Sequence, residues 1–241
     1  MSALRRTILG VTVVLVAAIA CALGRWQLHR LHARRASNAV LRAAQEQPPL
    51  LLPDAVISGT PIDSGRRITA RGRFDLAGQM VLRERVQDEA PGVQIVTPFV
   101  LDRGAGVLWV LRGFVRSPDA VTPPDSIPPP ASGDTVIEGL ALALPVTTDG
   151  GQPLRYHGTT TWKRLDRATL ASRRPGSLGV YLLLAADSAH TGGLAVVPPT
   201  PFSDGPHLSY AIQWFGIALA VLVFGVIMLW RDRRARPQPV P

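Results

Sequence analysis

"HLSYAIQWFGIALAVLVFGVIMLWRDRRAR", residues 207–236, begins with polar and aromatic residues, continues as an unbroken apolar run and ends in arginines. Within it, residues 210–230 are 21 positions without a charge, and Gln213 is their one strongly polar side chain. The hydrocarbon core of a bilayer is ~30 Å thick and requires roughly 20 helical residues to cross. A helix in a soluble core is rarely apolar on all sides for that length. We therefore predict a transmembrane helix over residues 210–230.

The charges beside this span predict its orientation. Four arginines follow the span within residues 231–236, whereas no Lys or Arg lies between Arg174 and the end of the span. Short segments that stay in the cytoplasm carry an excess of such cations. The tail 231–241 is therefore predicted to be cytoplasmic, and His207 is predicted to lie at the outer side.

A second apolar run opens the chain. Residues 7–24 are 18 uncharged positions, which is the short end of the range for a transmembrane helix. The run could also be a cleaved signal peptide, because AIAC, ending at Cys21, weakly resembles a lipoprotein cleavage site. The sequence GRWQLHRLHARR, residues 24–35, has no helix breaker after Gly24. We therefore expect a retained helix that continues beyond the membrane.

The charges around this first helix point the opposite way, because only two arginines precede it and four follow it. Two helices joined by a large domain must place both chain ends on one side, and the second helix has the clearer asymmetry. The predicted layout is that of a multi-pass protein of the bacterial inner (plasma) membrane. Its segments are a cytoplasmic tail (1–6), a transmembrane helix (7–24), an extracytoplasmic β-rich domain (25–209), a second transmembrane helix (210–230) and a cytoplasmic tail (231–241).

The region between the helices has the pattern of a β domain. Short apolar or alternating runs are separated by turn residues, which is typical of strands. We expect strands at 66–74, 79–85, 93–101, 107–115, 135–142, 180–186 and 194–197. The third and fourth strands predict a hairpin, residues 117–133 with six prolines predict a loop, and residues 162–174 predict one helix. The expected fold class is a membrane protein of the α+β type, in which an N- and C-terminal transmembrane hairpin flanks a mostly antiparallel β domain.

The composition and the motifs exclude several function classes. The net charge is +9, but no DNA- or RNA-binding motif accompanies it and the arginines gather at the predicted membrane edges, so we expect no nucleic acid partner. The single cysteine, Cys21, excludes an intramolecular disulfide and a CxxC site. The sequence contains no GxSxG, HExxH, P-loop or GxGxxG motif. We therefore expect no catalytic residues and no enzyme activity.

Several histidines outside the second helix have ordinary interpretations. His29 and His32 lie three residues apart in an arginine-rich helix and are interpreted as interfacial side chains. His157 is interpreted as a turn residue. The motif DSAH, residues 187–190, is too compact in sequence for a catalytic triad and is interpreted as a polar loop.

His207 lies in a different setting, a layer of polar and aromatic side chains predicted at the outer membrane edge. The layer comprises Trp26, Gln27 and Arg30 from the first helix, and His207, Tyr210, Gln213 and Trp214 from the second. His207, Tyr210 and Trp214 share one helix face because they are spaced by three and seven residues. An aromatic belt explains the tryptophans and the tyrosine. It does not explain the glutamines, which are costly in lipid without hydrogen bonds; pairing of Gln27 with Gln213 and binding of a ligand both remain open.

Three motifs occur in order along the chain. They are LGRWQLHRLHARR (23–35), GVQIVTPFVLDRGAGVLWVLRGFV (92–115) and HLSYAIQWFGIA (207–218). Together they resemble the surfeit-locus cytochrome oxidase assembly family, which shows G-x-W-Q-x-x-R, a T-P stretch leading to an N-R-G-W strand, and H-x-x-Y-A-x-x-W-F. The chain departs from that family at Arg34, where lysine is usual, at Leu111 and Phe114 in the N-R-G-W strand, and at residues 204–206, where asparagines are often found.

The resemblance implies a role in the assembly of haem-copper (cytochrome c) oxidases, with haem a bound at the outer membrane edge and passed to the catalytic subunit. It implies that His207 ligates the haem iron, that Arg30 neutralises propionates, and that the remaining residues of the layer surround the ring. The partners it implies are oxidase subunits and the haem a synthesis machinery, in the same lipid membrane. Two alternatives remain, namely a scaffold of oxidase subunits that binds no cofactor and an unrelated membrane-tethered β domain.

Overall fold

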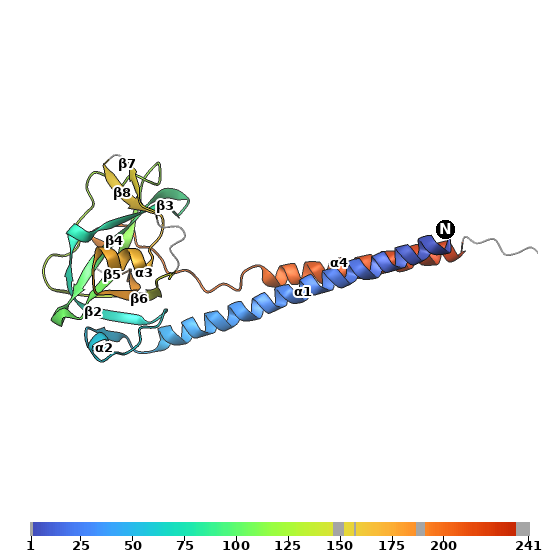
Figure 1. Cartoon of the computed structure of the whole chain (residues 1–241), viewed down its shortest axis with the longest axis horizontal. Helices are drawn as coiled ribbons and strands as arrows, with labels where there is room; N and C mark the ends of the chain where they lie inside the picture. Colours follow the sequence, from blue (N-terminus) through green and yellow to red (C-terminus); the bar gives the residue numbers. More distant parts are fainter. Residues whose placement is uncertain (1, 147–151, 157, 187–190, 235–241) are drawn as a thin grey trace, which may run out of the picture. The chain divides into compact units, whose positions relative to one another are not determined.

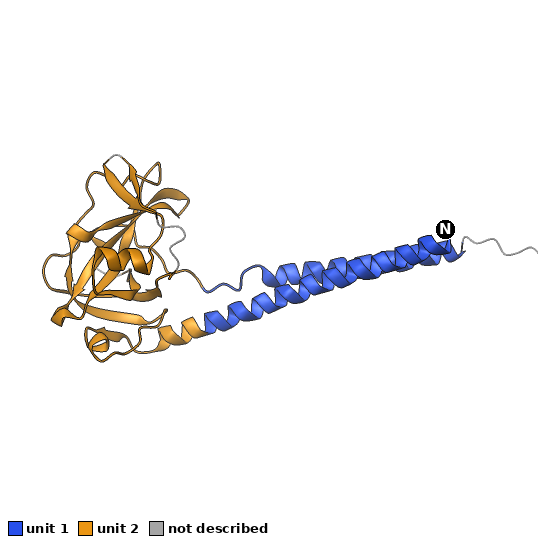
Figure 2. Ribbon diagram, in the orientation of Figure 1, with its two compact units in different colours: residues 1–39, 202–241 blue, residues 40–201 orange. Residues whose placement is uncertain are grey.

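The computed structural model of the chain describes residues 2–146, 152–156, 158–186 and 191–234. Figure 1 shows the order of its helices and strands along the chain. The chain divides into two compact units, one formed by residues 1–39 and 202–241 and the other by residues 40–201 (Figure 2). The first unit contains the two long helices, and the second contains the β domain.

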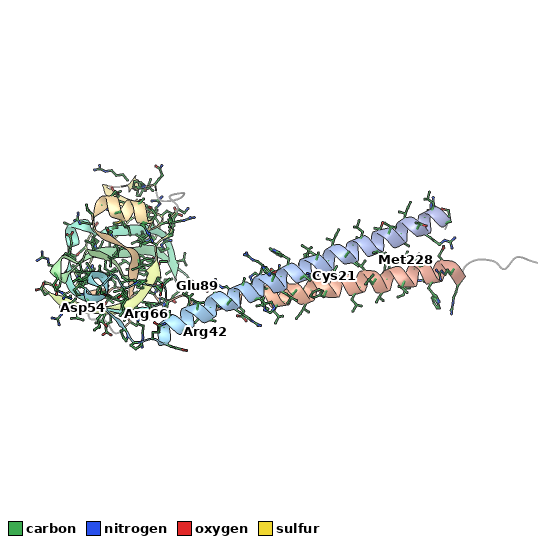
Figure 3. All side chains as sticks on the ribbon, turned by 60° about the horizontal axis from the view of Figure 1, so that its bottom comes forward. Cys21, Arg42, Asp54, Arg66, Glu89 and Met228 are labelled. Atoms are coloured by element: carbon green, nitrogen blue, oxygen red, sulfur yellow. The ribbon has the colours of Figure 1, made fainter. Side chains whose placement is uncertain are left out.

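The first unit is a pair of apolar helices that lie side by side (Figure 1, Figure 3). They are α1 (Ala3–Glu46), whose last turns belong to the second unit, and α4 (His207–Arg234). Both helices are long and apolar enough to cross a membrane. The helix α1 continues through Gly24 without a break, as we predicted from the sequence, so it extends past its apolar run.

Small residues line the contact between α1 and α4. The contact buries Ala17, Ala20 and Gly24 on α1, and Ala211, Ala218 and Gly225 on α4. The three on α4 recur every seventh residue, which is the repeat of helices that wrap around each other in left-handed pairs. A Cβ added at Gly24 would lie 2.8 Å from the Phe215 ring, and one added at Gly225 would lie 2.6 Å from Val13. The two backbones therefore approach closely, as helices in membranes do where small residues meet.

The second unit is a β-barrel. Its described residues form a nine-stranded sheet in the order β1-β2-β6-β9-β5-β4-β3-β8-β7, and an additional pairing of β2 with β4 closes β2, β6, β9, β5 and β4 into the barrel. The strands are β1 (Leu50–Leu52), β2 (Arg67–Phe74), β3 (Met80–Gln87), β4 (Ala90–Leu101), β5 (Val107–Arg116), β6 (Thr135–Ala143), β7 (Leu154–Tyr156), β8 (Thr159–Trp162) and β9 (Ser177–Leu184). Most neighbours are antiparallel, whereas β1–β2, β3–β8 and β5–β9 are parallel.

Strand β5 is buried on both faces along most of its length. Leu108 and Val110 belong to one hydrophobic cluster, and Trp109 belongs to a second. The second cluster includes Leu170 of α3 (Arg167–Arg173), which is 0% exposed. The remaining short helices are α2 (Asp54–Ile57), η1 (Leu76–Gly78) and η2 (Asp102–Gly104). A strand that is buried on both faces has mostly consecutive apolar residues, and this pattern predicted β5.

The structure confirms most of the predicted strands and corrects two elements. The strands β2, β3, β4, β5, β6 and β9 lie where the sequence predicted them, and β4 and β5 form the predicted hairpin. The strand predicted at 194–197 is wrong, because only Ala195 pairs, in a single bridge with Phe114. The helix predicted at 162–174 is too long, because Trp162 ends β8 and the Asp166 carboxylate caps α3 instead. The strands β1, β7 and β8 were not predicted, since three or four residues are too few for a periodic pattern.

Candidate ligand site on the helix pair

A hydrogen bond between the two helices fixes the imidazole of His207. Its Nδ1 lies 2.9 Å from the amide oxygen Oε1 of Gln27. Because an amide oxygen can only accept, Nδ1 carries the proton and donates it to this bond. A neutral imidazole of this kind has its lone pair on Nε2, and a neutral ring nitrogen is the form that binds metals. The pairing therefore selects a tautomer and an orientation that suit His207 for a ligand role.

The Nε2 edge of the His207 ring lies beside Gly205. A methyl group added at Gly205 would be 3.6 Å from Nε2 and 3.5 Å from Cδ2. Gly205 has a φ angle of +68°, a conformation that glycine adopts far more readily than other residues. Glycine therefore makes the turn that precedes α4 and also keeps a side chain away from this edge of the ring.

Polar contacts hold the segment before α4 against α1. The carbonyl oxygen of Ser203 accepts hydrogen bonds from Arg34 Nε at 3.2 Å and from Asn38 Nδ2 at 3.1 Å. Arg35 forms an exposed ion pair with Asp204 at 2.8 Å. Asn38 is only 4% exposed, so its hydrogen bond is shielded from water. The start of α4 is thus positioned by α1 at several points.

A shallow cleft of about 420 Å³ lies at this end of the helix pair. It is lined by Arg30, Ala33, Arg34, Ser37, Ser203, Gly205 and His207. Arg30 and Arg34 are four residues apart and therefore share a face of α1. No carboxylate lines the cleft among the described residues. The cleft is therefore positively charged and suited to an anionic group beside the imidazole.

The structure brings several predicted residues together at this end of the unit. His207 is hydrogen-bonded to Gln27 and shares the cleft with Arg30. Trp214, two turns further along α4, is half-buried and packs against the small residues of the helix contact. The pairing of Gln27 with Gln213 that the sequence allowed is not formed, because Gln213 is exposed and the oxygen of Gln27 is bonded to His207.

The other aromatic residues of the predicted layer face outward. Trp26 is 54% exposed and Tyr210 is 45% exposed. His207 and Trp214 lie on the side of α4 that contacts α1, whereas Tyr210 falls at the margin of that side. These exposed rings are therefore available to a flat apolar ligand or to lipid.

Other candidate residues do not join this site. His29 and His32 are exposed on α1. Within the described ranges, no group of three or more His, Cys, Asp or Glu side chains is arranged to hold a metal ion. His157 and the motif at 187–190 lie outside the described residues.

Sequence reasoning did not assign Arg34, Ser37 or Asn38 to the site. The sequence could have indicated Arg34, because it lies one helical turn after Arg30 and so shares its helix face. The contacts of Asn38 and Arg34 with Ser203 depend on how the chain returns from the barrel to α4. That return is not visible in a local sequence pattern.

Two long apolar helices that pack together, each apolar enough to cross a membrane, and a β-barrel between them in the sequence place this chain in the α+β class. The chain belongs to the SURF1 family, whose sequence profile matches residues 14–219, and this confirms the resemblance seen in the three motifs. It is 32% identical over 219 residues to an uncharacterised SURF1-like protein of Mycobacterium bovis, covering 89% of this chain and 79% of the relative. A SURF1-like protein of Monosiga brevicollis is 28% identical over 226 residues, covering 86% of this chain and 82% of the relative.

The SURF1 family is generally linked to cytochrome oxidase assembly, and its assembly factors are generally non-enzymatic. This agrees with the sequence, which contains none of the common catalytic motifs that were sought. Family membership thus links the chain to oxidase assembly, and the residues around His207 form an oriented imidazole beside a positively charged cleft.

Proposed function

We propose that this protein is an assembly factor for a haem-copper (cytochrome c) oxidase, which binds haem a through His207 and aids its insertion into the catalytic subunit. Membership of the SURF1 family supports the oxidase context. The observation that carries the haem proposal is the hydrogen bond from His207 Nδ1 to Gln27 Oε1. It leaves Nε2 as the basic nitrogen of a ring whose orientation is fixed.

The imidazole of His207 fits the requirements of an axial haem ligand. Haem iron commonly takes a histidine on one side of the ring. A metal-bound histidine usually donates its other N–H to an acceptor, which orients the ring and raises its basicity. Gln27 supplies that acceptor, and glycine at position 205 keeps the Nε2 edge free of a neighbouring side chain.

The cleft fits the acidic edge of a haem. Haem propionates are carboxylates, and arginine forms strong, often bidentate hydrogen bonds with carboxylates. We propose Arg30 as a propionate partner, since it lines the same cleft as His207. The other proposed site residues would supply aromatic cover for the ring or a nearby amide: Trp26, Tyr210, Gln213 and Trp214.

We further propose that both chain ends lie in the cytoplasm of a bacterial cell and that the barrel lies outside the inner membrane. The arginines after residue 230 support this orientation. The site would then lie at the outer membrane edge, where oxidase subunits and the haem a synthesis machinery are its partners. Reporter fusions at Pro241 and within residues 118–130 should give opposite signals, and an outward-facing Pro241 would refute the orientation.

The proposed function is tested by purifying the full-length protein from cells that make haem a and recording its absorption spectrum. A deletion strain is assayed for oxidase activity in parallel. We expect haem a bands in the purified protein and a fall in oxidase activity in the deletion strain. A fall in activity without bound haem would instead favour a scaffold of oxidase subunits that binds no cofactor. Unchanged activity and no haem would contradict both and favour an unrelated membrane-tethered β domain.

A further inference from the structure

A buried arginine in the barrel has no carboxylate partner among the described residues. Arg112 of β5 is 1% exposed. Among these residues its guanidinium donates to neutral oxygens, namely Gln79 Oε1 at 3.2 Å and the carbonyl oxygens of Pro128 at 2.6 Å and Thr191 at 3.1 Å. Burial lowers the pKa of Arg112 to about 10, so the group keeps its charge at neutral pH. A buried charge without a counter-ion is costly, and a positive potential must extend from it into its surroundings.

Gln79 links this charge to a cleft. Arginine can only donate, so the atom facing Arg112 is the amide oxygen of Gln79. The same oxygen accepts from the hydroxyl of Thr97 at 3.2 Å, and Thr97 is 0% exposed. The amide is therefore fixed through its oxygen, and in the described part of the chain its Nε2 hydrogens donate to no protein acceptor. Because hydrogen bonds in series polarise one another, the buried cation makes this amide a stronger donor.

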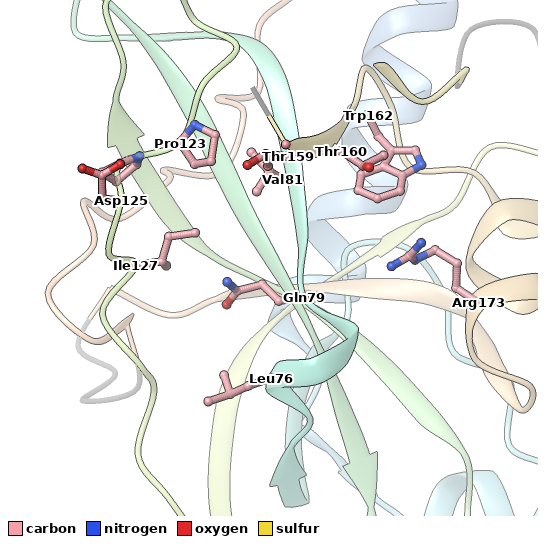
Figure 4. A pocket seen from close by; sticks show the side chains of 12 residues that line it. Leu76, Gln79, Val81, Pro123, Asp125, Ile127, Thr159, Thr160, Trp162 and Arg173 are labelled. Atoms are coloured by element: carbon pink, nitrogen blue, oxygen red, sulfur yellow. The ribbon is translucent and has the colours of Figure 1, made fainter. Parts of the chain in front are cut away.

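The cleft lined by Gln79 has a volume of about 620 Å³, which lies within the usual range for ligand pockets (Figure 4). Arg173 lines it as well, with its Cζ 4.6 Å from the centroid of the Trp162 ring. Figure 4 shows Asp125 at the side of the cleft away from Arg173. Within the described residues, no carboxylate forms an ion pair with Arg173, whereas its neighbour Arg174 is paired with Asp75. Stacking on an aromatic face holds a guanidinium and leaves its edge free for an oxyanion.

We infer that this cleft binds a carboxylate group between the guanidinium of Arg173 and the amide of Gln79, with Arg112 as the positioning residue behind that amide. Arg173 and Asp125 are the charged residues that line the cleft, and the buried Arg112 adds a second positive charge behind Gln79, so an anion is favoured on the side away from Asp125. Asp125 would repel a second acid group at the far side, so the ligand has one carboxylate at the Arg173 side. The carboxylate can belong to an acidic side chain of an extended polypeptide or to a small free acid. The inference does not depend on haem binding at His207.

The test uses the full-length protein in lipid nanodiscs with ¹⁵N-labelled tryptophan, and it follows the indole N–H resonance of Trp162 by NMR. The resonance is assigned with Trp162→Phe. The probes are N-acetyl-Gly-Glu-Gly-amide, the matched neutral N-acetyl-Gly-Gln-Gly-amide, and propionate. We expect saturable shifts with the Glu peptide and at least about tenfold weaker binding of the Gln peptide. Equal binding of propionate would support the inference and identify a small acid as the ligand. No shift with either acid would overturn it.

Two variants and one control make the test specific. Gln79→Glu keeps an oxygen acceptor for Arg112, so the barrel should fold, but it removes the N–H donors and adds a negative charge. We expect Gln79→Glu and Arg173→Gln each to weaken binding of the Glu peptide at least about tenfold. Arg155→Gln removes an exposed arginine of β7 that does not line the cleft, and it should change the affinity less than about twofold. If Gln79→Glu is more stable to heat yet binds the Glu peptide unchanged, Gln79 is purely structural and the inference is wrong.

Discussion

The imidazole of His207 and the amide of Gln27 lie 2.9 Å apart and join the first residue of α4 to α1 across 180 positions of sequence. The bond satisfies the amide oxygen of a half-buried glutamine, which would be costly to leave unpaired. It also leaves one nitrogen of the imidazole basic and oriented. A hydrogen bond between Gln27 and Gln213 would also have satisfied the amide, but it would have left no basic nitrogen for a ligand. The choice of histidine as the partner of Gln27 therefore favours ligand binding over helix packing alone.

Gln27→Leu should weaken haem binding by about tenfold, because loss of the acceptor frees the tautomer and the orientation of the His207 ring. The affinity is measured by titrating haem into the full-length protein and following its absorption. Gln27→Glu retains an acceptor for Nδ1 and should restore most of the binding. If both variants bind haem as the wild type does, Gln27 has no role in orienting the ligand.

Gly24→Leu should separate α1 from α4, since even a Cβ at this position would lie 2.8 Å from the Phe215 ring. Overpacking of this kind costs about 1–3 kcal/mol. The thermal unfolding temperature of the full-length protein in detergent reports the loss. Gly10→Leu is the matched control, because a Cβ there meets nothing within 4 Å. Equal unfolding temperatures for the two variants would contradict the described helix contact.

Gly72→Ala should open the seam between β2 and β4. Gly72 pairs with Leu101 there, and an added Cβ would clash with the carbonyl oxygen of Val100. We expect a loss of roughly 2 kcal/mol in the free energy of unfolding, measured by denaturant titration with near-UV circular dichroism. Gly133→Ala meets no neighbour and carries only the strain of a φ of +84°, so it should cost about 1 kcal/mol. A Gly72→Ala variant as stable as wild type would argue against barrel closure at this seam.

Asn38→Ala should destabilise the protein by about 1 kcal/mol, because it removes a shielded hydrogen bond to the carbonyl oxygen of Ser203. Asp204→Asn breaks an exposed ion pair with Arg35 and should cost less than about 1 kcal/mol. Thermal unfolding of both variants compares the two contacts. A larger effect from Asp204→Asn would show that the ion pair, rather than the buried amide, fixes the start of α4.

The proline-rich loop should hold its structure in acid. Asp119 accepts hydrogen bonds from Thr122, Val121 and Ser117, and these bonds, led by that of the Thr122 hydroxyl, lower its pKa well below the usual 3.8. A lowered folded-state pKa means that the ionised group contributes stability above pH 3.8, which is lost as the pH falls toward the folded-state value. The difference in unfolding temperature between wild type and Asp119→Asn should be constant from pH 7 to about pH 5 and shrink only below pH 3.8. A difference that already shrinks near neutral pH would contradict this account.

The elements that the sequence predicted are those with local signals. The run at 210–230 was predictable because its length and lack of charge suit a membrane span. The strand β5 was predictable because burial on both faces favours consecutive apolar residues. The closure of β2 on β4 is not readable, since it depends on strands far apart in sequence. His207 and Gln27 were both placed in one layer by their positions near the predicted outer helix ends, but their hydrogen bond was not predicted, because it depends on how α1 and α4 pack. Arg112 appeared in the sequence as one polar residue in an apolar strand, and only the fold shows that it is buried behind Gln79.

The absorption spectrum of His207→Ala tests the proposal that His207 ligates haem iron. The full-length variant is purified from cells that make haem a, beside Trp214→Phe, which should retain haem, and Arg30→Gln, which should bind it more weakly with the same spectrum. We predict that His207→Ala reaches the membrane at a normal level and that its haem bands are lost or shifted. A folded His207→Ala that holds haem with an unchanged spectrum would contradict the claim.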